Sequence, residues 1–184
     1  MSHDSPISLH GTGPTLAKQA VQAEGGHWPL PEGTMLASLP KRGAAWMLDW
    51  ILIMAVLGLL TKFRILGAYQ MDLAIAPLNW AIIAATYYLY HKYALIRFGR
   101  SLGQRWFGLA VVMEDGGAPS RDAAGARAWR KLVYAFPIVQ LIFFFRHGRQ
   151  IHTRHTHQSN IDLVCATAVV VANSLPPARR RHLR

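Results

Sequence analysis

A carboxylate lies inside the first long apolar run of this chain. Residues 44–60 carry one charge, Asp49, and a Lys41-Arg42 pair precedes them. A helix over this run is about 25 Å long, enough to cross most of a bilayer. An acid at the centre of a bilayer costs ~3 kcal/mol on insertion scales and usually has a function. Asp49 is therefore the first candidate site residue.

Three arginines could pair with Asp49. Arg42 lies seven residues earlier, on the same helical face but about 10 Å away. Arg105 and Arg127 belong to a basic segment that could fold back onto the helix. Without a cation or hydrogen-bond donors, burial raises the pKa of a carboxylate. Asp49 is thus either half of a structural ion pair or a group that binds a cation or a proton.

Other residues with possible chemistry lie near the end of the chain. Asp162 could cap a turn or join the same network through Arg105. The histidines of residues 146–160 could bind a transition metal, since imidazole suits zinc, copper or nickel. We interpret this loop as basic and solvated, because it contains no cysteine or carboxylate, and we expect no metal or other cofactor. The weaker metal candidates are His152, His155 and His157.

Nucleophilic catalysis has little support in the sequence. Cys165 is the only cysteine, so no intrachain disulfide can form. Neither Ser101 nor Thr167 has an evident base, and no phosphate-binding glycine loop is present. We expect a protein that is not an enzyme.

Two apolar segments predict membrane helices that carry these residues, at about 42–60 and 73–93. Trp46 and Trp50 mark one interface, and tyrosines beside a basic loop mark another. A third segment, 128–145, has an uncharged part that is short for a span, with Pro137 at its middle. It could span, re-enter or lie at the interface.

A short β element is expected between the second and third segments. Residues 107–113 are rich in β-branched side chains, and Glu114–Gly117 predicts a turn. Residues 167–171 have the same character and could pair with 109–113. The fold class is therefore a mainly α, polytopic membrane protein with two full spans, a proline-kinked third segment and a small cytoplasmic β element.

The charge pattern favours a membrane over nucleic acid. The net charge is +11, and basic residues flank apolar runs instead of forming one stripe. The arginine-rich segment 94–131 should face the cytoplasm, as should the N-terminus, with loop 61–73 outside. We expect a flexible tail over 1–38, a membrane domain over 39–172 and a basic tail over 173–184.

In order, these pieces resemble the RDD family of small bacterial membrane proteins. The opening motif Arg-x-x-Ala-x-x-x-Asp is matched by Arg42, Ala45 and Asp49. A loop motif is matched by Ser101-Leu102-Gly103-Gln104-Arg105, Gly108-Leu109-Ala110-Val111-Val112, Asp115-Gly116, Pro119-Ser120 and Arg127. The closing motif resembles Asp162 to Thr167, with Ile161, Leu163 and Ala166 where the family has histidine, arginine and glycine.

The resemblance implies a multi-pass protein of the bacterial cytoplasmic membrane. One hypothesis is transport of an ion or small ligand, with Asp49 as the cation- or proton-binding carboxylate. The other is a non-catalytic module that assembles with or stabilises another membrane protein through an arginine–aspartate network. Expected partners are anionic lipid headgroups and either further copies of the chain or another membrane protein.

Overall fold

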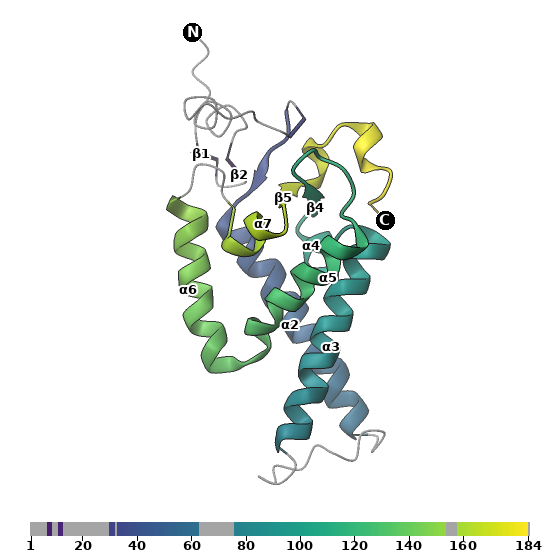
Figure 1. The fold of residues 1–184 in the computed structure, drawn as a ribbon, viewed down its shortest axis with the longest axis vertical. Helices are drawn as coiled ribbons and strands as arrows, with labels where there is room; N and C mark the ends of the chain where they lie inside the picture. The colour runs from purple at the N-terminus through teal and green to yellow at the C-terminus, as the bar shows by residue number, and fades with distance from the viewer. Residues whose placement is uncertain are drawn as a thin grey trace.

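The computed structural model describes residues 7–8, 11–12, 30–31, 33–62, 76–153 and 158–183. Two long helices, α2 (Leu39–Lys62) and α3 (Ala76–Phe98), project from a small sheet that is surrounded by shorter helices (Figure 1). The molecule is mainly helical, as the sequence predicts. The expected loop 61–73 begins later than predicted, because Thr61 and Lys62 belong to α2, and its residues 63–73 lie outside the described residues, as does most of the expected tail over 1–38.

Helix α2 is the candidate membrane helix. Among the described residues, only Leu39–Leu59 is long and apolar enough for a span. Ile53 and Leu57 of α2 pack against Ile83 and Tyr87 of α3. Helix α3 extends five residues past its predicted end at 93. That end carries His91, Lys92 and Arg97. Helix α3 is therefore less apolar than α2, although the two helices lie side by side.

The predicted strand pairing is confirmed. Strand β4 (Leu109–Met113) and strand β5 (Thr167–Val171) are antiparallel, with Val111 opposite Val169. Their valines suit a pleated surface, and Gly116 (φ 77°) supplies the left-handed residue of the turn after β4. The sheet continues through β3 (Leu36–Ala37), β2 (Gly11–Thr12) and β1 (Ile7–Ser8) in the order β1-β2-β3-β5-β4.

The prediction of a flexible tail over residues 1–38 is wrong for Leu36 and Ala37, which form strand β3. Leu36 and Ala37 are fully buried and pair with β5 through Leu36 and Val170. Alternate residues of β4 belong to two hydrophobic clusters of the core. Ala110 and Val112 are in the cluster of Leu36, and Leu109 and Val111 are in the cluster of Ala37. The strand that leads into α2 is therefore part of the core. At the other end, after η2 (Ala172–Ser174), Leu175 is also buried, before η3 (Pro177–Arg180).

The third apolar segment is not one kinked helix. It divides into α5 (Arg121–Arg130), the 3-10 helix η1 (Lys131–Ala135) and α6 (Pro137–Thr153). Pro137 begins α6 instead of bending it, because proline fits the first helical position, where its missing N–H costs nothing. The chain reverses near Phe136, so α6 runs back toward the sheet (Figure 1).

Two short helices are capped by serine. Helix α4 (Leu102–Trp106) follows Ser101, and α7 (Asn160–Val164) follows Ser159. Each forms a capping box, closed by the side chain of Gln104 or Asp162. Both caps lie at the sheet end of the molecule, where the polar site is built.

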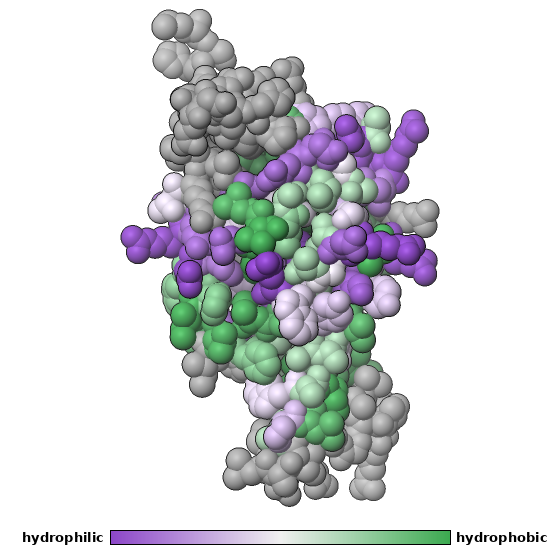
Figure 2. All heavy atoms as spheres, viewed as in Figure 1, coloured by the Kyte–Doolittle hydropathy of each residue, from purple (hydrophilic) through white to green (hydrophobic). Residues whose placement is uncertain are grey.

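Polar and apolar side chains occupy different zones of the surface. Hydrophilic residues gather around the short helices and the C-terminal segment, whereas hydrophobic ones cover much of the described surface toward the far ends of the long helices (Figure 2). The exposed apolar residues include Met47, Ile51, Val56 and Leu59 of α2, Leu78 and Leu89 of α3, and Leu141, Ile142 and Phe145 of α6. This distribution fits a protein whose helices meet lipid.

Candidate functional site

Asp162 is the centre of a buried ion-pair network. Arg42 donates from Nη1 to Asp162 Oδ2 over 2.8 Å, and Arg127 Nη1 lies 2.5 Å from Oδ1. Ser159 donates to Oδ2 from both its backbone nitrogen and its hydroxyl, each over 2.9 Å. Burial by itself would raise the pKa of Asp162, but the charges of Arg127 and Arg42 lower it well below the usual range. Asp162 is therefore an ionised carboxylate that forms ion pairs with two arginines.

The two arginines connect this carboxylate to the sheet. Arg42 donates from Nε to the carbonyl of Ala37 and from Nη2 to that of Val169, both over 3.2 Å. Arg127 donates from Nη1 to Thr167 Oγ1 over 2.6 Å. Because α2, α5, α7 and the sheet all meet here, the network fixes how the candidate membrane helix leaves the sheet.

Asp49 forms a second buried site, in which no arginine of the described residues takes part. Oδ1 accepts from the Tyr90 hydroxyl (2.6 Å) and the Gly103 backbone N–H (2.7 Å), and Oδ2 accepts from the Ser101 hydroxyl (2.5 Å). The side chain is 1% exposed. Neutral donors thus replace the arginine partner expected from the sequence. Asp49 ties α2 to α3 and to the start of α4.

The structure separates the residues that the sequence grouped together. Arg42 and Arg127 meet at Asp162, whereas Arg105 is exposed on α4 and takes part in neither site. Among the metal candidates, His152 is exposed and His155 and His157 lie outside the described residues. Within the described part of the chain, no three histidine, cysteine or acidic side chains gather as a metal site would require.

Three ligands of Asp49 had no assigned role in the sequence. Ser101 and Gly103 are motif residues, and their place in the motif was the one signal in the sequence that could have pointed to them. Tyr90 was grouped with the aromatic belt. Tyr90 and Asp49 are 41 residues apart in the sequence, so no local sequence pattern could predict their hydrogen bond.

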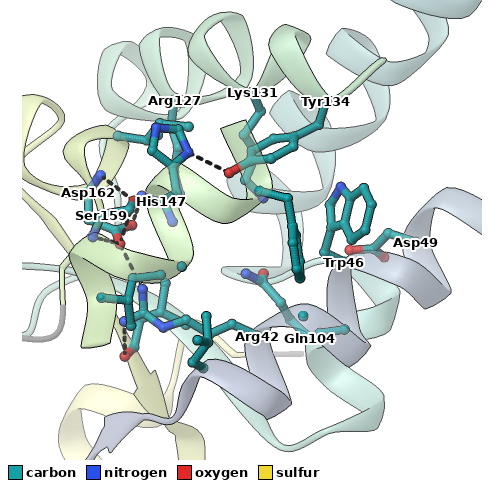
Figure 3. A pocket seen from close by; sticks show the side chains of 18 residues that line it. Arg42, Trp46, Asp49, Gln104, Arg127, Lys131, Tyr134, His147, Ser159 and Asp162 are labelled. Atoms are coloured by element: carbon teal, nitrogen blue, oxygen red, sulfur yellow. Dashed lines mark hydrogen bonds and ion pairs between the residues drawn. The ribbon is translucent and has the colours of Figure 1, made fainter. Parts of the chain in front are cut away.

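A cavity of about 100 Å³ lies between the two sites. We call it the Arg–Asp cavity. Charged residues of its wall come from α2 (Arg42, Asp49), from α5 and η1 (Arg127, Lys131) and from α7 (Asp162). Trp46 and Phe144 add aromatic rings, which lie 5.5 Å apart between centroids. Figure 3 shows the charged side chains and Trp46 converging from separate elements.

A hydrogen-bonded pair completes one wall. The Tyr134 hydroxyl and His147 Nδ1 are 2.5 Å apart, which joins η1 to α6 (Figure 3). Both residues line the cavity. The returning helix α6 is thus attached to the charged site, so the cavity has polar groups from both halves of the third segment.

The part of the chain that contains both sites matches a known family. The sequence profile of the RDD family matches residues 36–166. The chain belongs to the RDD family. No curated protein and no solved structure matches it. The matched region includes Arg42, Asp49, Arg127 and Asp162, so both buried sites lie within the RDD homology.

The structure explains the small residues of the RDD motifs. A Cβ on Gly103 would collide with the carbonyl oxygen of Ala45 and lie 3.0 Å from Asp49 Cγ. Ala45 itself is 1% exposed. The motif residues Ala45 and Gly103 therefore allow α4 to approach α2 closely enough for its N–H to reach the carboxylate.

The closing motif departs from the family at a strained position. Ala166 has φ 48°, a left-handed conformation that costs an L-residue ~1 kcal/mol or more. The family's glycine would adopt it freely. We expect Ala166→Gly to raise the unfolding free energy by about 0.5–1 kcal/mol, measured by denaturant unfolding in micelles. Ala126→Gly, at an exposed α5 position, is the control and should lower it instead.

Proposed function

We propose that this RDD protein is a non-catalytic, multi-pass protein of the bacterial cytoplasmic membrane that transports a small charged ligand. Helices α2 and α3 cross the bilayer, α6 re-enters, and the N-terminus and the sheet face the cytoplasm. The observation that supports the proposal is the Arg–Asp cavity beside α2, because a charged, partly aromatic cavity against a membrane helix can hold a ligand on its route. Two spans are too few to enclose a pathway, so several copies complete it.

Asp49 has a revised role in this proposal. Three of the about four acceptor positions of its carboxylate are taken by Tyr90, Ser101 and Gly103. The side chain nevertheless lines the cavity. Its charge therefore contributes to the field that the ligand meets, while its hydrogen bonds keep α2, α3 and α4 together. Carriage of a cation by Asp49 would require one of these bonds to open.

The second candidate function is a non-catalytic module that stabilises another membrane protein. It is favoured by the saturation of Asp162, whose two oxygens meet guanidinium groups of the same chain. In this case the arginine–aspartate network stabilises the module itself, and the apolar outer faces of the helices contact the partner.

Substitution of Asp49 separates the two functions. Asp49→Asn retains the volume but directs an amide N–H₂ at groups that donate, so we expect about 1–3 kcal/mol less stability. Because the bonds that hold α2, α3 and α4 around the cavity are then broken, we also expect at least a tenfold loss of flux per folded molecule. The measurement is ion flux in proteoliposomes under imposed sodium, potassium or phosphate gradients, with the folded protein quantified in each sample. Arg105→Gln, an exposed change, should leave flux intact.

The module reading predicts a different result. Wild-type protein would then carry none of these ions, and Asp49→Asn would lower cellular abundance and the recovery of a cross-linked membrane partner. Absence of flux for the wild type under every gradient would count against transport.

A further inference from the structure

We propose that the Arg–Asp cavity binds a compact oxyanion and that Lys131 is the cation that receives it. The inference deepens the proposed function, on which it rests, by naming the chemistry of the ligand. A soluble phosphate and the phosphate of a lipid headgroup share this chemistry. Lys131 is not one of the motif residues through which the sequence resembles the RDD family.

The charges of the cavity wall favour an anion. Three cations line it, Arg42, Arg127 and Lys131, against two carboxylates, so the wall has a net charge of 3 − 2 = +1. Both guanidinium groups address the same acid, Asp162. The other acid, Asp49, is stabilised by neutral donors of its own chain. Among the described residues, neither carboxylate therefore forms an ion pair with Lys131, although both attract it through space.

Lys131 and Arg127 have donors to spare. Within the described part of the chain, no hydrogen bond or ion pair engages the ammonium of half-buried Lys131. Arg127 Nε is buried without an acceptor in the same described region. The two residues are four apart where α5 continues into η1, so their side chains start from one side of the chain. A cation removed from water costs several kcal/mol unless an acceptor meets it, which an oxyanion supplies.

Figure 3 shows Arg127, Lys131 and Tyr134 reaching the cavity from one stretch of chain, and Arg42 and Trp46 reaching it from α2. One water needs about 10–15 Å³ of such space, so about 100 Å³ holds several waters or one tetrahedral oxyanion. A bare cation would enter a wall of net positive charge and find carboxylate oxygens already accepting bonds. Size and sign therefore both select a small anion.

The remaining polar groups do not oppose this assignment. Tyr134 and His147 bond to each other, and Gln104 accepts the backbone N–H of Ser101 as the α4 cap. Ser159 donates to Asp162. These groups form bonds within the chain, so Lys131 and Arg127 Nε are the cationic donors that remain for the oxyanion.

The test uses the full chain in phosphatidylcholine nanodiscs without any gradient. Inorganic phosphate is titrated at constant ionic strength against chloride, and the thermal midpoint is followed by tryptophan fluorescence. A second arm uses discs that contain phosphatidic acid and no added phosphate. We expect the wild-type midpoint to rise with at least one of the two sources. A rise only with phosphatidic acid assigns the headgroup, and a rise only with phosphate assigns a soluble ligand.

Lys131 variants decide whether the response belongs to this cavity. Lys131→Met should weaken the response at least tenfold and raise the anion-free midpoint, because it removes a desolvated cation. Lys131→Arg should keep the response, and so should the matched control Arg105→Gln. No rise with either source, or an equal rise in Lys131→Met, would overturn the proposal. Binding is measured here without flux, so the two proposals can fail separately. Intact binding with no transport would overturn only the proposed function. Transport without binding would overturn only the proposal that the cavity binds an oxyanion.

Discussion

Asp162→Asn is expected to lower the free energy of unfolding by about 3–5 kcal/mol, the cost typical of breaking a buried ion pair from one side. The amide keeps the volume of the acid but leaves Arg42 and Arg127 without their common counter-charge. Both guanidinium groups are nearly inaccessible to water, with 10% and 5% of their side chains exposed. The loss is read from denaturant unfolding in micelles and from protein abundance in the membrane.

The control for this substitution is Asp122→Asn, which removes an exposed acid from the first turn of α5. It should cost at most about 1 kcal/mol, the upper end for a charge near a helix N-terminus at the surface. Equal losses in the two variants would show that the network contributes nothing specific.

The network also predicts the sign of a pH dependence. Because the folded-state pKa of Asp162 is depressed, its stabilising contribution is complete above the unfolded-state value near 4 and is lost as the pH falls below it. Asp162→Asn should therefore flatten the decrease in stability of the wild type between about pH 5 and pH 2. A wild-type profile that rises with acidification would contradict this assignment.

Gly103→Ala is expected to cost more than about 3 kcal/mol, since the new Cβ meets backbone that cannot yield like a flexible side chain. The clash is with the carbonyl of Ala45, in α2. Moving α4 away to relieve it would break the 2.7 Å bond from Gly103 N to Asp49 and strain the bond from Ser101. Thermal unfolding and limited proteolysis after Arg105 report the loss.

Gly58→Ala is the matched control within α2. A Cβ on Gly58 meets nothing within 4 Å, and alanine favours a helix by about 1 kcal/mol over glycine. This variant should be as stable as the wild type or more so. If Gly103→Ala behaved in the same way, the close approach of α4 to α2 would be wrong.

Local patterns in the sequence were sufficient for the long helices and for the pair of strands β4 and β5. The apolar run after Arg42 predicts α2, and the β-branched stretches predict β4 and β5 with their pairing, because side-chain period and turn residues act over short distances. They did not predict β3, since two residues carry no periodicity. The kink expected at Pro137 was wrong, because proline alone does not distinguish a kink from the start of a new helix.

The pairing of charges depended on tertiary structure. Side chains of a helix tilt toward its N-terminus, so Arg42 at the start of α2 reaches back to the sheet and Asp162, away from Asp49. Asp49 lies two turns further along α2, so its partners are donors from α3 and from the start of α4.

By itself, then, the sequence determined the membrane helix, the strand pair, the RDD family and the residues that carry charge. Only the tertiary structure decided that these residues form two sites and not one, with a cavity between them and a lysine in its wall that forms no ion pair within the described residues. The reason is physical: burial makes every charge require a partner, but which partner it meets is set by how elements distant in sequence pack together.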